Sequence, residues 1–270
     1  MRMFYRIALV LIALVLAALI LAFAAPASAR DAKLPTLPTG FVYLRDVDAS
    51  IAQDMRYAAR DNFTGRPLPG YGAAECVLRR DVALALKRVQ ADLAKASLGL
   101  KVYDCYRPAR AVAAMARWAN DGASDTPAKR FYPALEKRTL FAAGYIAAIS
   151  AHSTGTAVDL TLVRLPAPAI QIFDSRASYG ACTGPAAQRA PDSGIDMGTG
   201  FDCFDAKSHT ASRAIAGELR HWRGVLLAAM RAHDFKNYFR EWWHFTYGGA
   251  LPAQVFDFPI VPRVRSSTSP

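Results

Sequence analysis

Two histidines and an aspartate have the types and spacing of metal ligands. His152 and Asp159 stand seven residues apart with Gly155 between them, and His244 closes the segment Glu-Trp-Trp-His. A turn at Gly155 could bring the first two side chains inward, and His244 could join them from another strand. Neutral imidazoles and a carboxylate suit Zn²⁺, and a hydrolytic zinc site has three protein ligands and an open position for water. The pattern predicts one zinc ion bound by His152, Asp159 and His244.

Two charged residues could act on a substrate beside such an ion, which would lower the pKa of its water to about 7. Glu241 lies three residues before His244, so its carboxylate could reach that water as a general base and later protonate a leaving amine. Arg107 is stiffened by the proline that follows it, and its permanent charge could stabilise an oxyanion. Histidine, aspartate and arginine more often have structural roles, so the spacing alone leaves that alternative open.

The composition indicates a globular chain. Of 270 residues, 53% are apolar and 20% are charged, which excludes intrinsic disorder and allows one large domain or two small ones. The net charge is +11, but the arginines are scattered without a long basic run. This distribution is typical of a solvated surface and argues against a nucleic-acid partner. The oligomeric state stays open.

The N-terminus has the pattern of an export signal. Arg2 and Arg6 precede an uncharged apolar run over 7–25, and small residues follow at 27–29. We therefore predict a signal peptide over 1–29, cleaved after Ala29, and an exported, periplasmic protein. Because about 20 apolar residues can also span a bilayer, an uncleaved anchor is the alternative and would be the only membrane contact.

Export changes the interpretation of the cysteines. The four cysteines are even in number, would meet an oxidising compartment, and form no Cys-x-x-Cys pair. Of the three pairings that are available, we favour the one in which Cys182 bonds to Cys203 and cross-links a Gly/Pro/Ala-rich loop. Cys76 and Cys105 would then form the second disulfide. Four buried thiols are the alternative.

The order of elements predicts an α+β fold with helices flanking a mainly antiparallel central sheet. Strands are expected at 41–44, 100–106, 157–163 and 242–247, helices at 81–97, 109–119 and 211–232, and a long irregular segment at 165–196. Helices and strands do not alternate regularly, so a parallel sheet is not indicated. We expect a linker at 30–40, a single domain at 41–262 and a C-terminal tail at 263–270.

Several motifs, in order, resemble the D-alanyl-D-alanine dipeptidases, which include the vancomycin-resistance dipeptidases. Ser-x-His-x-x-Gly-x-Ala-x-Asp at 150–159 and Glu-x-Trp-His at 241–244 resemble the zinc signature of that family. Further similar segments are Arg-Tyr-Ala at 56–58, Asp-Asn-Phe-Thr-Gly at 61–65, Asp-Cys-Tyr-Arg-Pro at 104–108, Asp-Met-Gly-Thr-Gly-Phe-Asp at 196–202, Ser-His at 208–209 and Phe-Asp-Phe-Pro at 256–259. The resemblance runs from about residue 41 to 260. It implies a fold shared with D,D-carboxypeptidases and the hedgehog signalling domain.

The resemblance also implies a role for each matching residue. The zinc ligands would be His152, Asp159 and His244. The base and the oxyanion-stabilising arginine would be Glu241 and Arg107. The substrate-binding set would be Asp202, Tyr57 and Ser150, which hold the amino end and backbone of a dipeptide, with Asp104, which orients the arginine. The implied activity is hydrolysis of D-Ala-D-Ala to D-alanine by attack of zinc-bound water.

A carboxylate aimed at the ammonium group of the substrate gives a physical reason for restriction to dipeptides. A longer peptide has a neutral amide at that place and would leave Asp202 buried and unpaired, so the site would discriminate strongly against longer peptides.

Two alternatives remain: a D,D-carboxypeptidase acting on peptidoglycan stem peptides, and a non-catalytic zinc-binding or cell-wall-binding module. Compared with the smaller cytoplasmic members, this chain adds the export signal, the cysteines and a longer excursion over 164–195. The excursion lies just before the substrate motif at 196–202, so it could change the width of the pocket.

Overall fold

The fold is described from a computed structural model, which covers residues 36–123, 128–249 and 254–263. The predicted signal peptide at 1–29 and most of the linker and tail lie outside these residues, so they stay predictions. Residues from Leu37 onward form one compact unit. No helix within the described ranges has the length and hydropathy required to cross a membrane.

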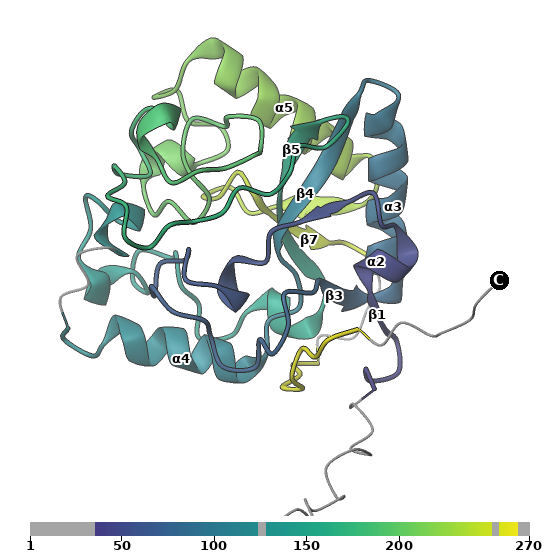
Figure 1. Cartoon of the computed structure of the whole chain (residues 1–270), viewed down its shortest axis with the longest axis horizontal. Helices are drawn as coiled ribbons and strands as arrows, with labels where there is room; N and C mark the ends of the chain where they lie inside the picture. Colours follow the sequence, from purple (N-terminus) through teal and green to yellow (C-terminus); the bar gives the residue numbers. More distant parts are fainter. Residues whose placement is uncertain (1–35, 124–127, 250–253, 264–270) are drawn as a thin grey trace, which may run out of the picture. The chain divides into compact units, whose positions relative to one another are not determined.

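A five-stranded sheet forms the centre of this unit (Figure 1). Its order is β2 (Ala52–Gln53), β4 (Leu98–Asp104), β5 (Ala157–Arg164), β7 (His244–Tyr247) and β6 (Phe235–Asn237). Only β2 and β4 run parallel, and the other neighbours are antiparallel. A separate antiparallel pair joins β1 (Phe41–Tyr43) to β3 (Val77–Arg79). The predicted α+β class with a mainly antiparallel sheet is confirmed.

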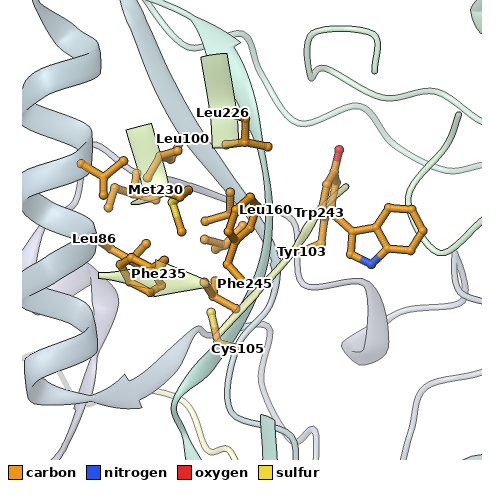
Figure 2. Close-up of a cluster of buried hydrophobic side chains, with 14 of the residues drawn as sticks. Leu86, Leu100, Tyr103, Cys105, Leu160, Leu226, Met230, Phe235, Trp243 and Phe245 are labelled. Atoms are coloured by element: carbon orange, nitrogen blue, oxygen red, sulfur yellow. The ribbon is translucent and has the colours of Figure 1, made fainter. Parts of the chain in front are cut away.

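Helices α3 (Arg80–Ala94) and α5 (Gly217–Arg231) pack on one face of this sheet. Alternate strand residues point to that face, because successive side chains of a strand point to opposite sides. Figure 2 shows the resulting cluster, in which Leu100, Leu160 and Phe245 of the strands meet Leu86 and Met230 of the two helices. The opposite face is left for polar side chains and irregular segments.

Of the other helices, α2 (Leu44–Val47) adds Leu44 to this core, whereas α4 (Ala109–Ala119) packs elsewhere. Single 3₁₀ turns lie at Arg56–Ala58, Ala128–Phe131, Lys137–Thr139, Ala151–Thr154, Ala186–Gln188 and Ala206–Ser208. The buried residues of α4 include Met115 and Trp118, which join a second apolar cluster with Phe63 and Phe204.

Several elements differ from the sequence-based expectations: the strand expected at 100–106 is β4 at Leu98–Asp104, and β2, β3 and β6 were not expected. The last helix begins at Gly217 rather than at 211, because Ile215 packs beside Gly198 in irregular chain. The first long helix ends at Ala94, and Gly99 lies inside β4, where a Cβ would approach the Gln90 side chain to 3.1 Å. The final strand begins at His244, since the two preceding tryptophans form a turn.

Both disulfides join segments that reach the polar face. Cys76 and Cys105 are bonded, which links the start of β3 to the end of β4, and Cys182 is bonded to Cys203. These are the pairs favoured from the sequence, and no described cysteine is free.

The segment 165–196 is irregular apart from one 3₁₀ turn, and Asp192 anchors it to the sheet. Its carboxylate accepts hydrogen bonds from Arg56 (2.8 Å), from the wholly buried Lys101 (2.5 Å) and from Tyr103 (2.8 Å). Burial alone would raise the pKa of Asp192, but Lys101 and Arg56 outweigh it and lower the pKa to about 2. Burial in turn lowers the pKa of Lys101, and the attraction of Asp192 only partly offsets that effect.

Replacing Asp192 should therefore remove a pH-dependent part of the stability. Because the folded-state pKa lies below the unfolded value, the stabilisation is complete near neutral pH and disappears as the pH falls through about 2. We expect Asp192→Asn to lower the free energy of unfolding by about 2 kcal/mol at pH 7, and by progressively less below pH 4. Urea unfolding between pH 2 and pH 7 measures this. Asp174→Asn, which alters an exposed pair with Arg176, is the control, and an equal effect in both variants would contradict the assignment.

Candidate active site

Three acidic and imidazole side chains form a row across the sheet at one end of the strands. Asp159 of β5 lies directly opposite His244 of β7 on one side and Asp104 of β4 on the other. Strand alternation alone would place Asp104 on the same face as Val102, which points toward the helices. A register shift between Val102 and Asp104 changes this, and β-bulges re-aim side chains in this way. All three groups therefore reach the polar face.

His152 enters the row from a 3₁₀ turn that precedes β5. The Ser150 hydroxyl caps this turn by accepting a hydrogen bond from the His152 backbone N–H (3.3 Å). Gly155 ends the turn with φ 75°, and a Cβ there would lie 2.4 Å from the Phe41 ring. Both the positive φ and the close approach of the ring require glycine at this position. The turn at Gly155 is the one that the sequence indicated between His152 and Asp159.

The tautomer of His152 leaves its second nitrogen free to bind a metal. Nδ1 lies 2.7 Å from the Cys105 carbonyl oxygen, which can only accept, so Nδ1 carries the proton and Nε2 has a lone pair. This hydrogen bond is the type that commonly orients histidine ligands. The disulfide with Cys76 fixes the residue that supplies the carbonyl.

The three potential ligand atoms converge. His152 Nε2, His244 Nδ1 and Asp159 Oδ1 lie 3.0, 3.1 and 3.3 Å from one another. Tetrahedral ligands at about 2.0–2.1 Å from one zinc ion would be roughly 3.3 Å apart. Burial would raise the pKa of Asp159, but the two histidines outweigh it and lower the pKa, while burial lowers the pKa of His244. Zinc binds a carboxylate in its ionised form and an imidazole through a nitrogen that carries no proton. One carboxylate oxygen and two imidazole nitrogens converge here, so these residues fit the ion.

Glu241 is held beside this triad without being part of it. Its carboxylate Oε2 is 3.9 Å from His244 Nδ1, and the residue is 8% exposed. The Asn237 amide donates to the carbonyl oxygens of Glu241 (2.8 Å) and His244 (2.9 Å), which fixes the turn between them. Burial raises the pKa of Glu241 well above its ordinary value, and the negative charges of Asp159 and Asp202 add to this.

Arg107 is oriented by a buried carboxylate. Its Nε and Nη2 donate to Asp104 Oδ2 at 2.9 and 2.8 Å, and its Nη2 is 3.7 Å from Asp159 Oδ2. The Tyr71 hydroxyl donates to the other oxygen of Asp104 (2.6 Å). The guanidinium also lies over the Tyr57 ring at 4.8 Å. Arg107 is thus held in one orientation beside the triad.

A cavity of about 290 Å³ opens in front of these groups. Asp202 lies in its wall, is 4% exposed, and accepts a hydrogen bond from the Tyr57 hydroxyl (2.7 Å). Burial and the charge of Asp159 raise the pKa of Asp202 well above its ordinary value. Ser150 also lines the cavity, whereas Asp104 does not. Asp104, which the sequence grouped with substrate-binding residues, is fully buried beneath Arg107, so it can orient the arginine but cannot contact a substrate.

Comparison with known proteins agrees with this geometry. Residues 38–261 match the D-ala-D-ala dipeptidase family. A D-alanyl-D-alanine dipeptidase of Streptomyces coelicolor is 35% identical over 225 residues, 82% of this chain and 98% of that protein. One of Enterococcus faecalis is 31% identical over 225 residues, 83% of this chain and 100% of that protein. One of Escherichia coli is 27% identical over 226 residues, 83% of this chain and 90% of that protein.

This chain belongs to the D-Ala-D-Ala dipeptidase family of zinc metallopeptidases. Within this member of the family, the excursion at 164–195 does not narrow the cavity, since none of its described residues lines it. The apolar part of the wall comes instead from Phe63, Met115, Ile146 and Phe204.

Sequence reasoning missed two kinds of residue in this dipeptidase site. Tyr71, which holds Asp104, lies in a loop between Gly70 and Gly72 with no periodicity or charge to mark it. Met115 and Ile146 were visible only as apolar residues of a helix and of an irregular segment. No local signal distinguishes a side chain that lines a cavity from one that fills a core.

Proposed function

We propose that this protein is a zinc-dependent dipeptidase that cleaves D-Ala-D-Ala into two molecules of D-alanine. The observation that carries the proposal is that four chemical groups line one cavity. They are the potential zinc triad, the buried carboxyl groups of Glu241 and Asp202, and the guanidinium of Arg107. A zinc-binding module without catalysis would have no use for Glu241 and Arg107 in these orientations.

Asp202 and Tyr57 would bind the amino end of the substrate. The ammonium group of a free dipeptide would add a positive charge beside the buried Asp202, which lowers the pKa of this carboxyl and favours its ionised form. The Tyr57 hydroxyl already donates to Asp202 Oδ2, which leaves the other oxygen for the ammonium. Recognition of the substrate is thereby tied to a terminal amine.

Zinc bound by His152, Asp159 and His244 would supply an activated water and a positive charge for the developing oxyanion. Glu241 would take the proton from the attacking water and return it to the leaving amine. Its raised pKa helps this carboxyl to hold the proton between the two steps. Arg107 would stabilise the negative charge that develops on the carbonyl oxygen.

Release of D-alanine from D-Ala-D-Ala tests the proposal. We expect the kcat/KM for the free dipeptide to exceed that for N-acetyl-D-Ala-D-Ala by at least about 10³-fold, because the acetylated substrate leaves Asp202 without a charged partner. A chelator should abolish the activity, and added Zn²⁺ should restore it. The measurement is D-alanine formed per unit time, by a coupled oxidase assay.

Two outcomes would replace the proposal. Preference for the N-acylated peptide would identify a D,D-carboxypeptidase. Zinc bound at full occupancy with no hydrolysis of either substrate would identify a non-catalytic zinc-binding or cell-wall-binding module.

A further inference from the structure

A buried arginine of α5 contacts the segment that carries Asp202. Arg223 is 2% exposed, and no carboxylate lies within ion-pair distance of it in the described part of the chain. Burial lowers the pKa of Arg223 to about 10, although the charge of Asp196 raises it, so the guanidinium is charged at neutral pH. A buried charge without an ion-pair partner in contact is costly and requires hydrogen-bond partners.

Those partners are backbone carbonyls at both ends of one loop, residues 197–209, which we call the substrate loop. Arg223 Nε donates to the Met197 carbonyl oxygen at 2.7 Å, where the loop begins. Its Nη1 donates to the carbonyl oxygens of Lys207 (2.9 Å) and His209 (2.7 Å), where the loop ends. One rigid planar group therefore fixes the distance between the two ends.

Asp202 lies in the middle of this loop and depends on its shape. Its backbone has φ 54°, a left-handed conformation that is uncommon for residues other than glycine and that the surrounding structure must enforce. Inside the loop, the Ser208 hydroxyl donates to the Cys203 carbonyl oxygen (2.6 Å). These contacts close the loop around Asp202.

The loop is also joined to the turn that carries Glu241. The Trp242 indole Nε1 donates to Thr199 Oγ1 (2.9 Å), and the Trp242 backbone N–H donates to the Ser208 carbonyl oxygen (3.1 Å). Trp242 is the next residue after Glu241. A shift of the substrate loop would therefore change the distance between Asp202, which would bind the amine, and Glu241, which would act as the base.

We propose that Arg223 is a positioning residue that sets the affinity and the selectivity of this enzyme for a substrate with a free amino end, by fixing both ends of the substrate loop. The inference rests on the proposed dipeptidase function. Arg223 does not line the cavity, so it acts through the substrate loop, and chiefly through Asp202 in the middle of that loop. Loss of its hydrogen bonds should weaken the binding of the ammonium in the ground state and the transition state alike, which raises KM and leaves kcat nearly unchanged.

The test compares Arg223→Met with Arg223→Lys in the holoenzyme. For D-Ala-D-Ala, we expect Arg223→Met to raise KM by about tenfold or more, because small displacements of a binding group are costly, and to change kcat by less than about threefold. Arg223→Lys, which retains the charge and some donors, should recover part of the affinity. Hydrogen exchange of the amides at 197–209 should accelerate in Arg223→Met, and this readout does not depend on activity.

Arg231→Met is the matched control, since Arg231 lies on the same helix and is exposed. A folded Arg223→Met enzyme with unchanged KM and unchanged exchange would overturn the inference, as would a loss confined to kcat. If Arg223→Met does not fold, an unchanged KM in Arg223→Lys beside an unchanged exchange profile overturns it equally. Inactive wild-type protein would refute the proposed function instead, while the exchange measurement would still decide whether Arg223 holds the loop.

Discussion

Replacing Glu241 by glutamine should lower kcat for D-Ala-D-Ala by about 10²–10⁴-fold, the range that a general base contributes. Glutamine has nearly the same shape as glutamate but cannot accept the proton of the attacking water. The Glu241 carboxylate is 3.9 Å from His244 Nδ1 and is not one of the three converging ligand atoms. The variant should therefore bind Zn²⁺ with the stoichiometry of the wild-type protein. Initial rates and metal analysis of the same preparation measure both quantities.

Glu218→Gln is the control for this variant, because Glu218 is an exposed carboxylate in the first turn of α5. It should retain wild-type kcat. Full activity in Glu241→Gln, or in Glu241→Ala, would reject the assignment of the base. A loss of activity that accompanies a loss of zinc would show instead that Glu241 helps to hold the ion.

Replacing Arg107 by lysine should lower kcat/KM by about 10²–10³-fold, although the charge is retained. Arg107 uses Nε and Nη2 to bind Asp104. Its Nη1 donates only to the Met115 sulfur (3.7 Å), a weak acceptor that a developing oxyanion would replace. A lysine ammonium is a single point charge and cannot make both sets of contacts. It would also leave Asp104, which is fully buried, with fewer donors. Steady-state kinetics with D-Ala-D-Ala measure the loss.

Arg110→Lys provides the comparison, since Arg110 is half-exposed and pairs with Asp257 at the surface. It should leave kcat/KM unchanged. If Arg107→Lys retained more than half of the wild-type kcat/KM, stabilisation of the oxyanion would have to come from another group.

Much of the fold could be predicted because its signals are local. Apolar residues spaced three and four apart define the buried face of α3, and alternation marks β4 and β5. The boundaries were less accurate where a tertiary contact overrides a local preference. Trp242 favours a strand by residue type, yet its indole donates to Thr199, which keeps it in a turn before β7.

The candidate site was predicted in its residue types, but not in the backbone geometry that positions them. The ligand set was visible because His152, Asp159 and His244 stand in a motif order that resembles a known family. Asp104 was visible too, but its burial beneath Arg107 follows from a register shift in β4, which the strand sequence does not reveal. Arg223 carried no signal, since a helical arginine is usually a solvated residue.

By itself, the sequence determined which groups can do chemistry and which segments carry them, because residue type and periodicity are properties of neighbours along the chain. Only the tertiary structure decided which of these groups meet. Asp159 and His244 are adjacent because β5 and β7 pair in one register, and Asp202 reaches the same cavity because a buried guanidinium holds both ends of its loop. Such contacts join residues far apart in the chain, and they are selected by the packing of the whole domain rather than by any local preference.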